Sequence, residues 1–269
     1  MRIAIVGLAN SGKSTVLCAL TGCEVGVGEH PFSTVECRSA PSLPRGGRRV
    51  DVVDTPGLCR GSAVGEGLGN AFLREVTDAD VLVAVIRAFG RGLAAAGGFV
   101  ERVDPFRDAV TLDNELAMAD TGLIREWLAG HGASSSTDVG RVEALRSVLS
   151  AIEHGQSART MGLAADELAD LTGIRLLTAK PLIIVSNVDE EDLYDGPQTP
   201  IAEDLQRKAD VTGTPVLAAC ARLEADSVRV DDVGSGSAEE SDLVEELTGV
   251  PCLLTRLLNV CETMRLFPA

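Results

Sequence analysis

The stretch Gly7-Leu8-Ala9-Asn10-Ser11-Gly12-Lys13-Ser14 decides the fold of this chain. It has the pattern G-x-x-x-x-G-K-S and lies between the apolar run 3–6 and the segment 15–20, which predicts the start of a helix. A strand, a loop and a helix in this order are the context in which the pattern binds a nucleoside triphosphate. The glycines let backbone N–H groups turn toward a polyphosphate, and the helix N-terminus adds partial positive charge.

The residue types of this loop predict which groups contact the nucleotide. Lys13 is expected to reach the β- and γ-phosphates and to stabilise charge there, and the Ser14 hydroxyl is expected to bind Mg²⁺. The predicted nucleotide contacts of the loop and the first helical turn are Asn10, Ser11, Gly12, Lys13, Ser14 and Thr15.

Composition limits the class of protein. Hydrophobic residues make up 45% of the 269 residues and aromatic residues 3%, so the core must be aliphatic. The net charge of −16 argues against a broad basic surface for nucleic acid. Apolar runs are shorter than the roughly 20 residues of a membrane helix, and the N-terminus leads directly into the first strand. We therefore expect a cytoplasmic protein with no membrane partner.

Short apolar runs along the chain predict a parallel sheet. They lie at 3–6, 49–53, 81–86, 182–185 and 216–220, and nearly continuous apolar strands separated by helices are typical of a sheet covered on both faces. Apolar residues at helical spacing in 112–127 and 142–152 predict an inserted helical hairpin. The predicted fold class is an α/β P-loop NTPase G domain, mostly parallel, formed by 1–110 and 173–269, with a helical hairpin at 111–172.

Two segments predict the metal and γ-phosphate contacts. Asp54-Thr55-Pro56-Gly57 follows a predicted strand and has the D-x-x-G pattern of GTPases, in which Asp54 holds Mg²⁺ through water and the Gly57 N–H senses the γ-phosphate. Lys13 and Gly57 are the predicted catalytic contacts. Thr34, in the segment 31–34, is predicted to complete the Mg²⁺ shell through its hydroxyl, with Ser33 as the alternative.

The base site is predicted at the ends of two later strands. GTPases use N-K-x-D there, whereas this chain has Asn187-Val188-Asp189-Glu190. The carboxylate of Glu190 is one methylene farther from the backbone than that of an aspartate, so the preference between ATP and GTP stays open. Cys220 and Ala221 follow the last predicted strand, where the final base-contacting loop is expected.

Several stretches together match one family. They are Gly7 to Ser14, 31–36, 54–58, 65–70, 103–105, 114–116 with 119–120, 176–181, 187–190 and 220–225. In these stretches the chain resembles the YchF branch of the Obg-like P-loop ATPases.

The resemblance implies a G domain with a helical insertion that hydrolyses ATP at the β–γ bond with Mg²⁺, often in preference to GTP. By this match Ser14 and Thr34 are Mg²⁺ ligands, Asn187 and Glu190 form the N-x-x-E mark of the branch, and Val188 lies against the adenine. The family is linked to the ribosome, to translation and to stress responses.

The chain departs from the family at two points. The loop 96–101 lacks the histidine that family members carry there, and the sequence stops at Ala269, where the family continues into a β-rich TGS domain. We expect that the TGS domain is lacking, which weakens the case for a ribosome partner. Leu58 stands where Ras-like enzymes have a water-orienting glutamine, so slow hydrolysis is expected. The alternative function is a nucleotide-dependent binding switch with negligible hydrolysis.

Overall fold

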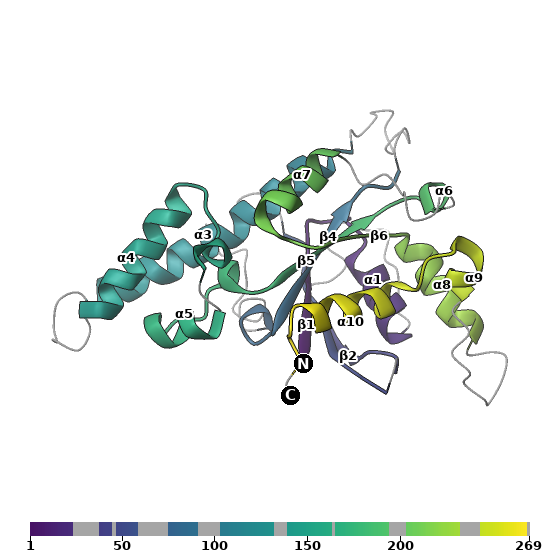
Figure 1. Ribbon diagram of the computed structural model, residues 1–269, viewed down its shortest axis with the longest axis horizontal. Coiled ribbons are helices and arrows are strands. Elements are labelled where there is room, and N and C mark those ends of the chain that lie inside the picture. Colours follow the sequence, from purple (N-terminus) through teal and green to yellow (C-terminus); the bar gives the residue numbers. More distant parts are fainter. Residues whose placement is uncertain are drawn as a thin grey trace.

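The computed structural model describes residues 1–23, 38–44, 47–58, 75–90, 103–131, 139–162, 165–193, 203–231 and 243–267. In these ranges a central sheet carries helices on both faces, and two long helices extend away from it to one side (Figure 1). The predicted fold class, a P-loop G domain with a mostly parallel sheet, is confirmed by this arrangement.

The sheet places the carboxyl ends of its five parallel strands on the same side. Its spatial order is β2-β3-β1-β4-β5-β6, and each of these pairings is parallel except β2 with β3. Because β1 lies between β3 and β4, the loop after β1 lies at a switch point, where ligands of such sheets bind. The strands are β1 (Arg2–Val6), β2 (Arg38–Pro41), β3 (Asp51–Asp54), β4 (Val81–Arg87), β5 (Leu182–Asn187) and β6 (Val216–Ala219).

The helices account for most of the remaining described residues. None of those described is both long and apolar enough to cross a lipid bilayer. The helical elements are α1 (Lys13–Thr21), α3 (Pro105–His131), α4 (Val139–Glu153), η1 (Ala158–Met161), α5 (Ala165–Thr172), η2 (Leu177–Ala179), α6 (Glu190–Leu193), α7 (Glu203–Thr212), α8 (Ala221–Asp231), α9 (Leu243–Thr248) and α10 (Leu253–Thr263).

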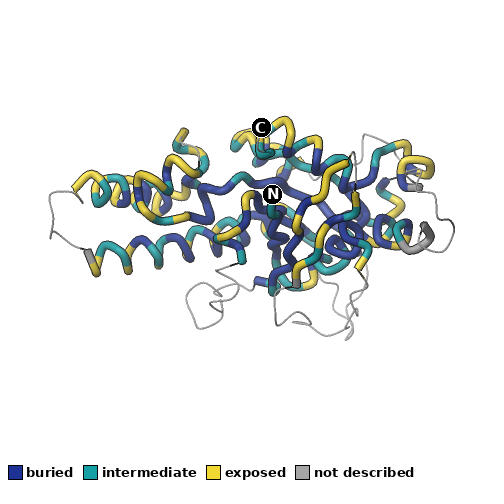
Figure 2. Tube along the Cα trace, turned by 90° about the horizontal axis from the view of Figure 1, so that it is seen from below, coloured by how far each residue is buried: buried dark blue, intermediate teal, exposed yellow. Residues whose placement is uncertain are grey.

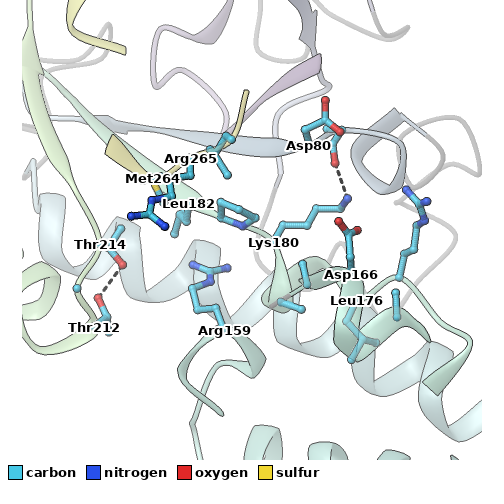
Figure 3. A pocket seen from close by; sticks show the side chains of 18 residues that line it. Asp80, Arg159, Asp166, Leu176, Lys180, Leu182, Thr212, Thr214, Met264 and Arg265 are labelled. Atoms are coloured by element: carbon cyan, nitrogen blue, oxygen red, sulfur yellow. Dashed lines mark hydrogen bonds between the residues drawn. The ribbon is translucent and has the colours of Figure 1, made fainter. Parts of the chain in front are cut away.

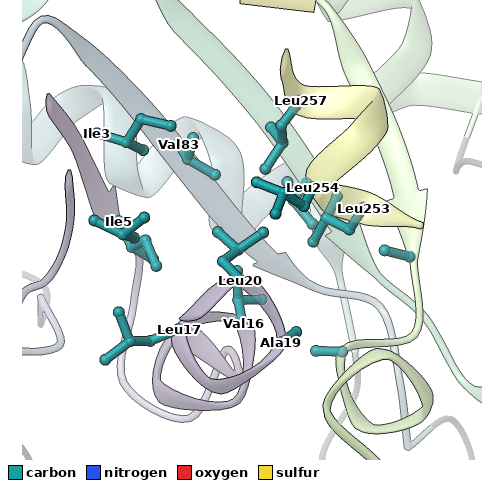
Figure 4. Close-up of a cluster of buried hydrophobic side chains, with 14 of the residues drawn as sticks. Ile3, Ile5, Val16, Leu17, Ala19, Leu20, Val83, Leu253, Leu254 and Leu257 are labelled. Carbon is teal, nitrogen blue, oxygen red and sulfur yellow. The ribbon is translucent and has the colours of Figure 1, made fainter. Parts of the chain in front are cut away.

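Alternation along the strands divides the core into two layers. Ile3 and Ile5 of β1 face the layer of α1 and α10 (Figure 4), whereas Ala4 and Val6 belong to the cluster that includes residues of α3. The buried residues lie in the strands and on the sides of the helices that face the sheet (Figure 2). Burial of one isoleucine, leucine or valine side chain contributes about 2 kcal/mol to folding. A core with few aromatic residues can therefore still stabilise this fold.

The edge strand β2 was not predicted from the sequence. Arg38-Ser39-Ala40-Pro41 has none of the β-branched or aromatic residues that indicate a strand. Its pairing with β3, in which Ser39 lies opposite Val53, fixes it as a strand. Proline is tolerated there because β2 is an edge strand.

Helix α3 begins earlier than its apolar spacing predicts. Pro105 is its first residue, and the Asp104 carboxylate accepts a hydrogen bond from the Arg107 N–H at 3.0 Å. An aspartate cap followed by proline is a favoured helix start. The helix runs without a break across residue 110, from the sheet layer around Leu112 into the hairpin cluster around Ile124. The division of the chain at 110 and 172 stays a prediction.

A buried joint ties this helix to the segment before β5. Asp120 is 0% exposed and accepts hydrogen bonds from the Leu177 N–H (2.8 Å), the Thr178 N–H (2.8 Å) and the Thr178 hydroxyl (2.6 Å). Two residues on, the Lys180 ammonium donates to the backbone oxygens of Thr77 and Ala79, which precede β4. The family stretches 119–120 and 176–181 therefore connect the hairpin to the sheet.

The joint is expected to make folding stability depend on pH. Burial raises the pKa of Asp120 from 3.8 to about 6, while the hydrogen bonds from Thr178 and Leu177 and the charge of Arg159 act in the opposite direction. Because the folded-state pKa is the higher one, the contribution is fully present below about pH 4 and is lost as pH rises through about 6. A shift of about two units corresponds to about 3 kcal/mol.

Chemical denaturation of the wild type and of Asp120→Asn between pH 4 and 7 measures this contribution. The difference between their unfolding free energies should change by about 3 kcal/mol across that range. Asp170→Asn, at an exposed position of α5, is the matched control and should follow the wild type at every pH. A constant difference between Asp120→Asn and the wild type would show that Asp120 is ionised in the folded protein throughout.

Candidate functional site

The loop between β1 and α1 has the backbone conformation that a phosphate cradle requires. Asn10 and Gly12 have φ angles of 61° and 94°, both in the left-handed region. A Cβ atom on Gly12 would lie 2.3 Å from Nδ2 of Asn187, so both backbone angle and space favour glycine there. The residues between Gly7 and Lys13 therefore turn tightly in front of the α1 N-terminus, where a phosphate group is favoured.

Lys13, Ser14 and Asp54 lie together beneath this loop. The Lys13 ammonium donates to the Leu8 carbonyl oxygen at 2.8 Å, and the Ser14 hydroxyl donates to Oδ2 of Asp54 at 2.7 Å. Asp54, the last residue of β3, is 0% exposed. A hydroxyl and a carboxylate are the hard oxygen donors that Mg²⁺ prefers, so the donor set fits this ion.

The segment after Asp54 is held against the phosphate loop. The Leu58 N–H donates to the Gly7 carbonyl oxygen at 3.0 Å, and the Ala9 N–H donates to the Leu58 carbonyl oxygen at 3.1 Å. A Cβ atom on Gly57 would lie 2.9 Å from the Ala9 Cα and 3.2 Å from the Lys13 Nζ, so Gly57 passes closer to the loop than any other residue type allows. Gly57 therefore lies beside Lys13, as a γ-phosphate contact requires.

Some predicted residues fall outside the described part of the chain. These are Thr34, its alternative Ser33, and the loop 96–101. Their roles stay predictions.

Leu58 has a role that sequence reasoning missed. Its side chain is 2% exposed and belongs to the same core cluster as Val6 and Leu82. It therefore packs into the core beneath the sheet edge, which explains why this position is hydrophobic. A glutamine in the same orientation would bury its amide in the core and would not reach a water molecule beside the phosphate loop.

Substitution of Leu58 by glutamine tests this placement. Leu58→Gln should lower the unfolding free energy by about 3 kcal/mol, because it removes a buried apolar side chain and buries an amide. It should also leave the rate of nucleotide hydrolysis no faster than in the wild type. Leu58→Met, which preserves apolar volume, is the control and should cost less than about 1.5 kcal/mol. A stable Leu58→Gln variant with faster hydrolysis would contradict the placement.

Asn187 links two loops of the site, a role that its predicted base contact did not include. Its Nδ2 donates to the Ser11 carbonyl oxygen at 3.1 Å, and its Oδ1 accepts from the Ala221 N–H at 3.0 Å. The residue lies at the end of β5, so one buried amide joins the phosphate loop to the loop after β6. The asparagine amide supplies both the donor and the acceptor that these two contacts require.

The other predicted base contacts lie around Asn187. Val188 is 1% exposed and packs with Ala88, Leu193 and Cys220, so its adenine contact stays a prediction. Burial raises the pKa of the Cys220 thiol, which favours its neutral form.

The two carboxylates that follow Val188 differ in their surroundings. Asp189 accepts a hydrogen bond from the Gly90 N–H at 2.8 Å and so ties the end of β5 to the end of β4. Glu190 is exposed at the first position of α6. The predicted base contact of Glu190 stays a prediction.

The chain is similar to known proteins along most of its length. The family model described as 50S ribosome-binding GTPase matches residues 2–125. The ribosome-binding ATPase YchF of Haemophilus ducreyi is 29% identical over 269 residues, covering 91% of this chain and 70% of that protein. An Obg-like ATPase homolog of Schizosaccharomyces pombe is 30% identical over 216 residues, covering 74% of this chain and 53% of that protein.

A solved structure shows the same fold. The structure of the Schizosaccharomyces pombe YchF GTPase matches with a TM-score of 0.70 at 22% sequence identity, covering 97% of this chain and 75% of that chain. Sequence and fold thus lead to one conclusion: the chain is a homologue of the YchF-type Obg-like ATPases and contains a P-loop GTPase domain.

Proposed function

We propose that this P-loop nucleoside triphosphate hydrolase acts on ATP, with GTP as the alternative substrate, at the β–γ bond with Mg²⁺. The observation that supports it most is the arrangement of Lys13 beside the hydrogen-bonded pair of Ser14 and Asp54, at the carboxyl edge of the sheet. This places a cation for the phosphate oxygens next to oxygen donors for a divalent ion.

Ser14 and Thr34 would hold Mg²⁺ directly, and Asp54 would hold it through water. The ion would neutralise charge on the β- and γ-phosphate oxygens. The Ser14 hydroxyl, which in the structure donates to Asp54, would turn one lone pair toward the metal while keeping this hydrogen bond.

The chain's own groups act mainly by positioning and by charge. Lys13 would exchange its bond to the Leu8 oxygen for the phosphate oxygens, where its charge stabilises the transition state. The Gly57 N–H would donate to the γ-phosphate beside it. Leu58 faces the core and supplies no water-orienting group, so slow hydrolysis is expected.

The base would lie between the ends of β5 and β6. Asn187 keeps the two loops together, Glu190 reaches the base edge, and Val188, Cys220 and Ala221 form the wall. The chain has Glu190 where GTPases carry aspartate, which supports a preference for ATP.

The partner proposed for the chain is the ribosome, because relatives carry the name ribosome-binding ATPase. With a net charge of −16, such binding would use a local surface rather than a broad basic face. We place the chain in the cytoplasm, and assign the partner surface to the hairpin unit at 111–172, apart from the G domain at 1–110 and 173–269.

Calorimetric titration of ATP and GTP with Mg²⁺ tests the proposal. ATP should bind at least about tenfold more tightly than GTP, about 1.4 kcal/mol, and excess EDTA should weaken binding. Glu190→Asp restores the GTPase residue and should shift the preference toward GTP, whereas Glu191→Asp, at the exposed neighbouring position, should not. Tighter GTP binding by the wild type would make the chain a GTPase, and binding unchanged by EDTA would overturn the metal roles of Ser14 and Thr34.

A binding switch with negligible hydrolysis is the second candidate, and the burial of Leu58 favours it. Single-turnover hydrolysis at saturating protein separates the two functions. Release of phosphate faster than from free ATP supports the enzyme. Nucleotide binding with no release above that background supports the switch.

A further inference from the structure

A cavity lies at the amino ends of the parallel strands, on the opposite side of the sheet from the phosphate loop. Its volume is about 560 Å³, and it is bordered by the starts of β4, β5 and β6, by η1 and α5, and by the residues after α10. Pockets for small molecules commonly have volumes of this order. It shares no lining residue with the nucleotide site described above.

The charge of this cavity is opposite to that of the whole chain. Arg159, Arg175, Lys180 and Arg265 line it, against two acidic residues, Asp80 and Asp166. The chain as a whole has a net charge of −16. Positive charge collected in a concave surface of a strongly acidic protein is the arrangement that attracts a small anion.

Arg159 is the cation at the centre of the lining. Figure 3 shows its side chain extending from η1 toward Leu182, between Lys180 and the hydrogen-bonded hydroxyls of Thr212 and Thr214. Its Nε donates to the Thr178 carbonyl oxygen at 3.1 Å, which fixes the plane of the guanidinium. The guanidinium end of this side chain lies on the cavity side (Figure 3).

The two carboxylates whose charges act on Arg159 have other partners. Asp113 pairs with Lys208, and Asp120 accepts the hydrogen bonds of the joint. Burial lowers the pKa of Arg159, while the charges of Asp113 and Asp120 act in the opposite direction. Among the described residues, no ion pair joins a carboxylate to Arg159, Arg175 or Arg265.

The two acidic residues of the lining do not cancel this charge. Asp80 accepts a hydrogen bond from the Arg2 N–H at 2.7 Å, and Asp166 is exposed in the first turn of α5. The Lys180 ammonium donates to two backbone oxygens and stays in place. Burial lowers the pKa of the Lys180 ammonium and the charge of Arg175 acts in the same direction, whereas the charges of Asp80, Asp166 and Asp78 act in the opposite one. The four cations of the lining still outnumber its two carboxylates.

Arg265 occupies a backbone position that favours glycine. It follows α10 with a φ of 57° and is one of two described non-glycine residues with positive φ, the other being Asn10 of the phosphate loop. An arginine at such a position is strained relative to glycine. Its side chain lines the cavity, so a ligand contact is a reason for arginine there.

We propose that this cavity binds a small organic phosphate, with the phosphoryl group on the Arg159 fork and the apolar body against Leu176, Leu182 and Met264. A guanidinium binds phosphate oxygens in pairs, and Arg265 adds a second cation. The apolar lining and the volume fit an organic ester better than a free inorganic ion. This site is independent of the proposed nucleotide hydrolysis.

Calorimetry with phenyl phosphate, which joins a phosphoryl group to an apolar ring, tests the site. The full chain should bind it with a Kd below about 1 mM, equally with or without excess ADP and Mg²⁺. Benzoate should bind at least about tenfold more weakly and benzyl alcohol not measurably. Loss of binding when ADP is added would place the probe in the nucleotide site and overturn the proposal, as would absence of binding or equal binding of benzoate.

Three variants separate a ligand contact from a structural role. Arg159→Gln should weaken binding at least about tenfold, and Arg265→Gly about threefold or more while keeping or raising the melting temperature, because glycine relieves the positive φ. Arg146→Gln, on the exposed face of α4, should bind as the wild type does. If Arg159→Gln does not fold, the binding of phenyl phosphate by Arg265→Gly is the test of the site. Unchanged binding by a folded Arg159→Gln or by Arg265→Gly overturns the site.

Discussion

Replacement of Lys13 by alanine is expected to lower the rate of nucleotide hydrolysis by about 1,000-fold, or about 4 kcal/mol in the barrier. The ammonium is largely buried, 2.8 Å from the Leu8 oxygen and next to Gly57, so no other described lysine can take its place. Its charge is already oriented before the nucleotide reaches the transition state, and water in the vacated space would not reproduce it.

Release of phosphate under single-turnover conditions measures this effect. Lys208→Ala is the matched control. Lys208 of α7 forms an ion pair with Asp113 of α3, so this substitution should leave the rate unchanged. Melting temperatures of both variants show whether the fold persists. A folded Lys13→Ala that hydrolyses ATP at the wild-type rate would remove the phosphate loop from the chemistry.

Asn187→Ala is expected to destabilise the fold by about 4 kcal/mol and to weaken nucleotide binding at the same time. The change leaves the Ser11 carbonyl oxygen and the Ala221 N–H buried without their partner, at about 1–3 kcal/mol for each group. It also opens space beneath Gly12, whose backbone lies against the amide. The phosphate loop then loses its connection to the loop after β6.

Urea denaturation and calorimetry together test this role. Asn259→Ala, at an exposed position of α10, is the control and should change the unfolding free energy by less than about 0.5 kcal/mol. Added Mg²⁺ and ATP should stabilise the wild type more than Asn187→Ala, because binding is linked to folding. A variant that binds nucleotide weakly at wild-type stability would make Asn187 a base contact only.

Local patterns account for what the sequence predicted well. The phosphate loop, the buried strands and the two helices of the hairpin follow from spacing within a short window, since glycines, apolar runs and helical periodicity act on neighbouring residues. The same periodicity is seen in α10, where Leu253 and Leu257, four residues apart, pack in the α1 layer.

What the sequence could not predict depends on contacts between distant segments. Strand β2 is fixed by its pairing with β3, and the orientation of Leu58 by the sheet beneath it. The sequence predicts a base contact for Asn187 but not its two bonds to backbone groups, because a pattern shows which residue lies at a strand end and not which groups surround it. The bond from Asn187 to Ser11 spans 176 positions of the chain.

The continuity of α3 has a mechanical consequence. The helix has 27 residues, about 40 Å, and Asp120 fastens it to the segment before β5 near its middle. The helix can therefore tilt about Asp120. The part before Asp120 packs on the sheet, and the part after it, about 16 Å long, carries the hairpin. A tilt of about 5° about that point would displace His131 by about 1.4 Å, so rearrangements of the sheet layer are transmitted to the far end of α3.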